Sequence, residues 1–428
     1  MLVARNVIDT LTERGFVSQV SDPDLAAKLS RPATVYAGFD PTAESLHVGH
    51  LVQILLLAQF QRHGHRPIAL VGGATAMIGD PSGKTQERQL LDQETIQRNQ
   101  AGIRQQLEQF LDFGGGAHSA LLVNNADWIG RFSFIEFLRD VGRHFRVGEM
   151  MGKESVRKRV QSGGGMSFTE FSYQLLQAYD FYYLNQQYDC LVQVGGDDQW
   201  GNITAGIDLT RRLCGRGVYG LTSPLLATAT GQKFGKTEAG AVWLDGQRSS
   251  PYEFYQYWIR CDDRDVVRLL KLFTFLEMEE IRDLEKVVQA EPEKRQAQKV
   301  LAQTVTRMVH GAEQTAAAQN ASQALFGQEV SGLSDRDLRS IFADVPSTAL
   351  ARARLAGGLA LVDVLCETGL CGSRGEAKKL IKGGGVYVNN VRVDELDARL
   401  TEESLASETM LVLRTGKKTH RLVQFQSQ

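Results

Sequence analysis

Short apolar runs alternate with longer stretches of helical spacing through the first half of the chain. The runs predict strands at 34–39, 67–72, 120–124, 190–194 and 221–226. The stretches between them predict helices at 51–60, 92–111, 134–140, 168–184 and 202–213. Strands joined by helical crossovers predict a mostly parallel, doubly wound, Rossmann-like α/β sheet, in which ligands lie beyond the carboxyl ends of the strands.

The second half of the chain changes character twice. From about 250 to 345, Leu, Val and Ala recur at helical spacing among many charges, which predicts an α-helical domain. A polar stretch at 343–357 predicts a linker. After it, we expect a helix at 359–368, a second helix begun by a capping box of Ser373 and Glu376, and a hairpin at 386–393 that turns at Asn389 and Asn390.

Composition narrows the class of protein. The 428 residues suggest about three domains, and the net charge of -2 excludes a uniformly basic nucleic-acid coat but not a local basic patch. No apolar run approaches the roughly 18 residues of a membrane helix, and the N-terminus lacks a signal peptide's apolar core, so we expect a cytoplasmic protein without membrane contact. Five scattered cysteines without a CxxC pair predict reduced thiols and no zinc site.

One helix of the C-terminal unit carries a basic face. A charged helix face is often only solvated, but cations on one rigid face also suit RNA phosphates. The motif SerArgGlyGluAlaLysLysLeuIle, followed by ValTyrValAsnAsn, resembles the S-four-type RNA-binding domain, with Asn390 where that family more often has glycine. The expected RNA contacts are Arg374, Lys378, Lys379 and Lys382.

Two motifs indicate nucleotide chemistry. His47 and His50 flank Gly49 at the start of a predicted helix, whose N-terminal amides favour anions. Such a pair alone is weak evidence, but Lys233, Lys236 and Thr237 form a lysine loop after the last strand. The two motifs together resemble the HIGH and KMSKS signatures of class I aminoacyl-tRNA synthetases.

A third glycine-rich segment resembles a phosphate-binding P-loop but does not match it. The sequence GlyAspProSerGlyLysThr occupies 79–85, and Ile78 stands where the motif requires glycine. We therefore reject a P-loop NTPase and keep Lys84 and Arg88 as expected phosphate contacts.

The helix at 168–184 indicates which amino acid is bound. Tyr173, Gln177 and Asp180 share one face of it, although apolar neighbours leave no clean solvated side. The string SerPheThrGluPheSerTyrGlnLeuLeuGlnAlaTyrAspPhe resembles the bacterial tyrosyl-tRNA synthetases, as do GlyPheAspProThrAla, GlyAspProSerGlyLys, AspGlnTrpGlyAsnIle and LysPheGlyLysThr. This resemblance covers essentially the whole chain.

The resemblance implies an activity and a set of site residues. The protein would activate L-tyrosine with ATP, accompanied by Mg²⁺, and transfer tyrosine to the 3′ end of tRNA(Tyr). Tyrosine would be bound by Tyr36, Asp80, Tyr173, Gln177, Asp180, Gln193 and Gln199. ATP would be bound by Asp40, Gly49, Asp198 and Lys236. Catalytic contacts to the phosphates would come from Thr42, His47, His50, Lys84, Arg88, Lys233, Lys236 and Thr237.

It also implies a domain plan and a homodimer. The plan has a catalytic domain at 1–230, an α-helical anticodon-binding domain at 231–350 that begins with the lysine loop, and the S-four-type domain at 357–428. The dimer would form through an insertion near 130–165, where PheSerPheIleGluPheLeu offers an apolar helix face.

Two alternatives and one departure from the family pattern stay open on the sequence. A tryptophanyl enzyme has the same fold class, but Tyr36 and Asp180 suit a hydroxyl that indole lacks. An RNA-binding protein with a decayed catalytic half would not be expected to keep both motifs intact. Asp197 stands where the family usually has serine, and we expect its charge to raise a neighbouring pKa or to repel phosphate, with a modest effect on ATP affinity.

Overall fold

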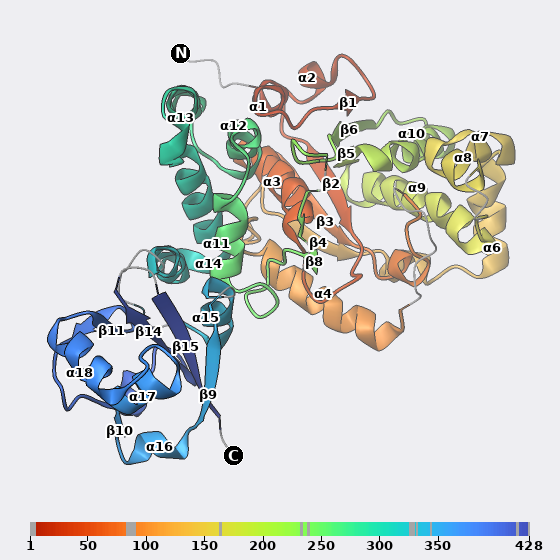
Figure 1. Cartoon of the computed structure of the whole chain (residues 1–428). Coiled ribbons are helices and arrows are strands. Elements are labelled where there is room, and N and C mark those ends of the chain that lie inside the picture. The colour runs from red at the N-terminus through yellow and green to blue at the C-terminus, as the bar shows by residue number, and fades with distance from the viewer. Residues whose placement is uncertain are drawn as a thin grey trace. The chain divides into compact units, whose positions relative to one another are not determined.

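The computed structural model shows two compact units (Figure 1). The first comprises 1–245 and 262–297, and the second comprises 246–261 and 298–428. The structure describes residues 6–82, 91–161, 165–231, 234–237, 240–324, 330, 333–342, 345–416 and 419–426. The three-domain division stays a prediction, because these two units divide the chain at other points.

A six-stranded sheet forms the centre of the first unit, in the order β1-β6-β5-β2-β3-β4. Its members are β1 (Gln19–Val20), β2 (Thr34–Phe39), β3 (Arg66–Val71), β4 (Leu121–Asn124), β5 (Cys190–Gly196) and β6 (Tyr219–Ser223). All neighbours are parallel except β1, which pairs antiparallel with β6. The predicted doubly wound parallel sheet is therefore confirmed.

The helices of this unit cover the sheet and carry the crossovers. The central crossover, α3 (Val48–Arg62), buries almost its whole length. The other long helices are α4 (Gln93–Leu107), α9 (Phe168–Tyr188) and α10 (Trp200–Cys214), of which α9 and α10 pack on each other. The predicted strand at 221–226 ends early, at Ser223, because Pro224 has no N–H to donate to a ladder.

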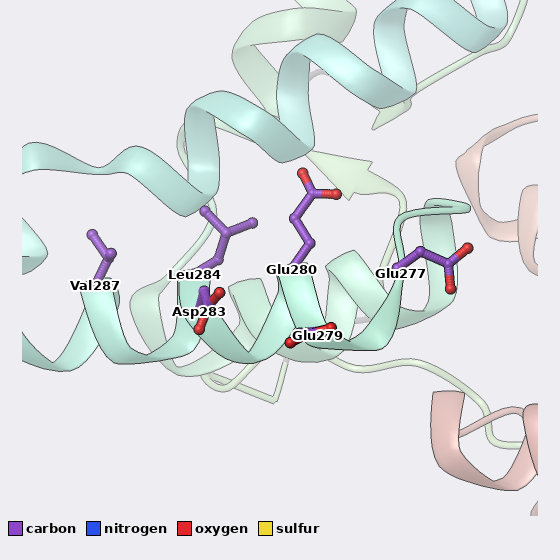
Figure 2. Close-up of a pocket in the computed structure, with 6 residues that line it drawn as sticks. All are labelled: Glu277, Glu279, Glu280, Asp283, Leu284 and Val287. Carbon is purple, nitrogen blue, oxygen red and sulfur yellow. The ribbon is translucent and has the colours of Figure 1, made fainter.

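Shorter helices complete the first unit. They are α1 (Val7–Arg14), α2 (Leu25–Lys28), α5 (Ala126–Ile129), α6 (Phe134–Asp140), α7 (Val147–Gly152), α8 (Glu154–Gln161), α12 (Asp263–Phe273) and α13 (Met278–Ala290). A shallow hollow along α13 is lined by carboxylates and two apolar side chains, as Figure 2 shows: Glu277, Glu279, Glu280, Asp283, Leu284 and Val287. Its negative charge is unsuited to triphosphate or RNA.

The second unit joins helices to a small mixed sheet. The helices α11 (Pro251–Ile259), α14 (Gln296–Ala324) and α15 (Asp335–Ile341) fulfil the prediction of a helical region. The sheet has the order β12-β11-β14-β15-β9, and α17 (Leu361–Glu367) and α18 (Arg374–Lys382) pack on its apolar core. Its strands are β9 (Ser347–Ala351), β11 (Val386–Val388), β12 (Val391–Val393), β14 (Met410–Thr415) and β15 (Thr419–Gln426).

The linker predicted at 343–357 is wrong. Residues 347–351 form β9, which pairs parallel with the last strand of the chain, and α16 (Ala353–Ala356) follows it. The predicted hairpin is confirmed, since Asn389 and Asn390 both have positive φ, at 50° and 64°. The predicted capping box is half formed: the Ser373 hydroxyl accepts from Glu376 N, but the Glu376 carboxylate accepts from Gly372 N.

Helices long and apolar enough to cross a membrane do not occur in the part of the chain that the structure describes.

Candidate functional site

A cavity of about 740 Å³ opens at the carboxyl ends of β2, β3 and β5. Most of the residues predicted for tyrosine and ATP line it together: Tyr36, Asp40, Thr42, His47, Gly49, His50, Asp80, Tyr173, Gln177, Asp180, Gln193, Asp198 and Gln199. They come from the ends of strands, from the loops that follow them, from the start of α3 and from α9, so the parallel sheet is what gathers residues this far apart in sequence.

The two histidines form the N-terminal cap of α3. His47 Nδ1 accepts from Gly49 N at 3.0 Å, and His50 Nδ1 accepts from His47 N at 3.2 Å. Their rings stack with centroids 3.9 Å apart, so both imidazoles lie at the positive end of the helix. A Cβ on Gly49 would lie 2.8 Å from His47 Cε1, which explains the glycine between them.

The segment after the lysine loop pairs with the segment that carries His47. Val48 N donates to Val242 O at 2.9 Å, and Leu244 N donates to Leu46 O at 2.9 Å. Lys236 and Thr237 form β7, which pairs with β8 (Gly240–Ala241). The two predicted motifs are therefore adjacent, while Lys84, Arg88 and Lys233 lie outside the described residues.

A buried carboxylate forms one end of the cavity. Asp180 is 1% exposed, and its two oxygens accept from Trp128 Nε1 at 2.8 Å and Asn125 Nδ2 at 3.1 Å. Burial raises the pKa of Asp180 to about 8, although both hydrogen bonds act to lower it. A donor from a ligand that stabilises the ionised form would therefore bind favourably here.

Tyr36 lies in the same region of the cavity. Its hydroxyl is buried and has no hydrogen-bond partner in the described structure, and its ring packs edge-on against Phe181. Burial, together with the charge of Asp180, raises the pKa of Tyr36 well above its ordinary value. The neutral hydroxyl is thus kept as a donor or acceptor for a polar group of a ligand.

A second carboxylate, Asp40, is held at the end of β2. It accepts from Thr75 Oγ1 at 2.7 Å and from the Tyr173 hydroxyl at 2.8 Å. A Cβ on Gly72 would lie 2.0 Å from Asp40 Oδ1, so this glycine makes room for the carboxylate and not for a ligand. Asp40 therefore fixes Tyr173, and α9 with it, against β2.

A third carboxylate begins a polar chain along the cavity wall. Asp80 Oδ2 accepts from Gln199 Nε2 at 2.7 Å, and Gln199 Oε1 accepts from Gln177 Nε2 at 3.2 Å. Asn202 Nδ2 donates to Gln177 Oε1 at 3.0 Å and closes the chain. Asp80, Gln177 and Gln199 all line the cavity, and their oxygens are of the kind that can also accept from an ammonium group.

The structure also adds residues that sequence reasoning did not assign. Asn125, Trp128, Thr75 and Asn202 orient the site carboxylates and amides. Asn124 and Asn125 stand at the end of the strand predicted at 120–124, and this position was the one signal in the sequence for Asn125. Gln53, on α3, also lines the cavity, and its amide donates to Ser223 Oγ at 2.8 Å.

The side chain of Asp197 does not face the cavity, where it would have to lie in order to repel a phosphate. Its side chain turns toward β1 and β6, where it accepts from Ser18 and Thr222, whereas Asp198 and Gln199 line the cavity. A carboxylate held on that side by hydrogen-bond donors is poorly placed to repel a phosphate in the cavity.

The predicted RNA contacts lie on one helix of the second unit. Lys378, Lys379 and Lys382 are exposed on α18, and Ala377 and Ile381 are buried beneath them. Arg374 is exposed too and pairs with Asp363 at 2.6 Å.

Groups of three or more His, Cys, Asp and Glu side chains suited to a metal ion do not occur among the described residues.

Comparison with known proteins places this geometry in a family. The profile described as tRNA synthetases class I (W and Y) matches residues 28–327, and that of the tyrosine--tRNA ligase SYY-like C-terminal domain matches 337–423. The tyrosine--tRNA ligase of Rhodopirellula baltica is 53% identical over 98% of this chain and 97% of its own. That of Geobacillus stearothermophilus is 49% identical over 98% of this chain and 100% of its own.

A solved structure agrees with the sequence relatives. The C-terminally truncated mitochondrial tyrosyl-tRNA synthetase of Coccidioides posadasii is 36% identical, has a TM-score of 0.65, and covers 73% of this chain and 91% of its own. The chain therefore belongs to the tyrosine--tRNA ligases, within the class I tRNA synthetases.

Proposed function

We propose that this protein activates L-tyrosine with ATP and then transfers tyrosine to the 3′ end of tRNA(Tyr). One observation carries the choice of amino acid. The Tyr36 hydroxyl, which has no hydrogen-bond partner among the described residues, and the buried Asp180 carboxylate line the same cavity. We also propose that the reaction takes place in the cytoplasm.

The phenolic hydroxyl of the substrate would lie between Tyr36 and Asp180. It donates to the carboxylate and accepts from the Tyr36 hydroxyl, which satisfies both buried groups. Phenylalanine would leave them unsatisfied, which costs about 1–3 kcal/mol for each buried polar group. Tryptophan offers no hydroxyl at this position.

The polar chain that begins at Asp80 would hold the amino-acid end. Asp80, Tyr173 and Gln177 supply acceptors for the ammonium group, and Gln193 and Gln199 line the space beside them. The chain of hydrogen bonds through Asn202 fixes these amides before the substrate arrives. Such preorganisation lowers the cost of positioning the carboxylate for attack.

The phosphates would lie over the N-terminus of α3. The tyrosine carboxylate oxygen attacks the α-phosphorus, the bond to the bridging oxygen breaks, and pyrophosphate leaves with that electron pair. Thr42, His47 and His50 would contact the phosphates, close to Gly49, while Asp40 and Asp198 would lie beside the adenylate. The leaving pyrophosphate would be stabilised by cationic side chains, those of Lys84, Arg88, Lys233 and Lys236, with Thr237 beside them. Mg²⁺ would enter bound to ATP, as part of the substrate.

The second step joins tyrosine to tRNA. A terminal ribose hydroxyl of tRNA attacks the carbonyl of tyrosyl-adenylate and an ester forms, while AMP leaves with the electrons of the anhydride bond and its phosphate takes up the proton of the hydroxyl. Positioning of the two reactants in the cavity supplies the rate.

ATP–pyrophosphate exchange with each amino acid in turn tests the proposed function. Because the hydroxyl is read by two buried groups, we expect exchange with tyrosine and little with phenylalanine or tryptophan. Charging of tRNA by the same preparation checks the second step. Exchange driven by tryptophan, or no exchange with any amino acid, would contradict the proposal.

We further propose that the exposed lysines of α18 contact tRNA phosphates. Buried Ala377 and Ile381 hold the helix against the core, so Lys378, Lys379 and Lys382 face solvent together, with Arg374 one turn earlier. Cations fixed on one rigid face suit a phosphate backbone.

Charge reversal separates RNA binding from activation. The double variant Lys378→Glu, Lys382→Glu should weaken tRNA binding and reduce its dependence on salt by about one unit of log–log slope for each phosphate that is no longer neutralised. Tyrosine-dependent exchange should not change. The control is Lys286→Glu, which reverses the charge of an exposed lysine on α13, a helix rich in carboxylates. Equal loss of exchange and charging in the double variant would refute a role limited to RNA.

We propose that the protein is a homodimer that associates through α6 and α7. Phe134 and Ile135 are 66% and 69% exposed, and Val147 is 66% exposed, so these short helices present an apolar surface. In Figure 1, both helices lie at the same end of the first unit. Apolar patches of this kind usually mark association surfaces.

Sedimentation equilibrium tests the dimer. We expect a mass near twice 47.4 kDa for the wild type and near 47.4 kDa for the double variant Phe134→Glu, Ile135→Glu. Leu396→Glu replaces an exposed apolar residue of the second unit and should leave the dimer intact. A monomeric wild type would refute the proposal.

A further inference from the structure

The carboxylate of Asp197 is the meeting point of three segments of the first unit. Its Oδ2 accepts from Ser18 Oγ at 2.7 Å, and its Oδ1 accepts from Thr222 Oγ1 at 2.6 Å and Gln19 Nε2 at 3.2 Å. Ser18 and Gln19 belong to the N-terminal segment around β1, and Thr222 is a fully buried residue of β6. One side chain thus fastens the end of β5 to both strands on its flank.

The turn that Asp197 begins carries two residues of the cavity. Asp197–Gln199 forms a single 3₁₀ turn between β5 and α10, and both Asp198 and Gln199 line the cavity. The turn is tight, because a Cβ on Gly196 would lie 2.8 Å from Asp198 Oδ1. Consecutive carboxylates therefore face opposite ways, Asp197 toward the flanking strands and Asp198 toward the ligand space.

We propose that Asp197 is a positioning residue for ATP: by anchoring the turn to β1 and β6, it fixes the carboxylate of Asp198 in the nucleotide part of the cavity. This inference rests on the proposed function, in which Asp198 lies beside the adenylate. Strand β1 pairs with β6 over two residues, and bonds from Ser18 N to Thr222 O and from Ser21 N to Gly220 O extend this pairing. The side-chain bonds of Asp197 tie the turn itself to these paired strands. Loss of the anchor would free the turn and misplace Asp198.

This role differs from an electrostatic effect of the extra charge. Repulsion of phosphate would weaken ATP binding in the wild type, so removal of the charge would improve it. An anchor acts through hydrogen-bond acceptors, so removal of the side chain weakens ATP binding, whereas a neutral acceptor of the same shape maintains it. Asparagine is that acceptor: its Oδ1 can accept from Thr222 and Gln19, and the Ser18 hydroxyl can rotate to accept from its Nδ2.

Exchange kinetics of the full-length protein test the proposal. Asp197→Ala should raise the KM for ATP about tenfold, the equivalent of about one to two hydrogen bonds. The KM for tyrosine should change less than about twofold, because Gln199, on the same turn, is held separately by Asp80 and Gln177. Asp197→Asn should stay within about twofold of the wild type for both. Thr222→Val removes a donor to the same carboxylate, so it should raise the KM for ATP and add little in combination with Asp197→Ala.

A control variant shows whether the change in KM is specific to Asp197. Asp22→Ala removes a carboxylate from the same N-terminal segment that pairs with Lys28 and not with the turn, and it should leave both KM values unchanged. An unchanged KM for ATP in folded Asp197→Ala, equal rises in both KM values, or a lower KM for ATP in Asp197→Asn would each overturn the proposal. Absence of tyrosine-dependent exchange in the wild type would instead overturn the proposed function.

Discussion

This site depends on one buried carboxylate, Asp180, which has no cationic partner in the part of the chain that the structure describes. Asp180 lies in a part of the cavity where burial disfavours its charge, and neutral donors from Asn125 and Trp128 hold it in place. The structure around it serves to maintain that arrangement. Helix α9 is buried along the face that carries Asp180, and the end of β4 leads directly into the loop of Asn125. A ligand that supplies one more hydrogen-bond donor stabilises the charge of such a carboxylate, and a phenolic hydroxyl is a donor of this kind.

The remaining carboxylates of the cavity follow the same principle. Asp40 and Asp80 are each held by neutral hydroxyls, amides or backbone N–H groups, so side chains are fixed before any substrate binds. The part of the cavity proposed for the phosphates is organised differently, by the N-terminus of α3 and by backbone pairing between 46–48 and 242–244. That pairing joins two segments that are far apart in the sequence. The proposed function thus assigns neutral, preorganised groups to the amino acid and a helix N-terminus to the phosphates.

The sequence was sufficient for the parts of this structure that depend on local pattern. Alternating strand and helix signals predicted the parallel sheet, and helical spacing placed Tyr173, Gln177 and Asp180 on one face of α9. The roles of these residues stay predictions, although the structure gathers them in one cavity. Strand β9 was missed because its partner is β15, at the far end of the chain, and its five residues, SerThrAlaLeuAla, include one β-branched and no aromatic side chain to signal a strand.

The supporting residues of the site could not be predicted, for a related reason. Neutral donors such as Asn125 and Trp128 belong to no motif, and only the folded sheet shows that they face Asp180. The orientation of the Asp197 side chain depends on β1, a strand of two residues. Because β1 and its partner β6 are far apart in the sequence, no local pattern predicts their pairing. The sequence alone does not show which of the two adjacent carboxylates, Asp197 or Asp198, faces the cavity.

The central claim is that Asp180 reads the hydroxyl of the substrate. Its most direct test is the ratio of kcat/KM for tyrosine to that for phenylalanine in pyrophosphate exchange, compared between the wild type and Asp180→Ala. Tyr182→Phe, a change to another hydroxyl of α9, is the control, and thermal unfolding confirms that each variant is folded. The account predicts a fall in this ratio of about tenfold to a hundredfold in Asp180→Ala and no fall in the control. An unchanged ratio in folded Asp180→Ala would contradict it.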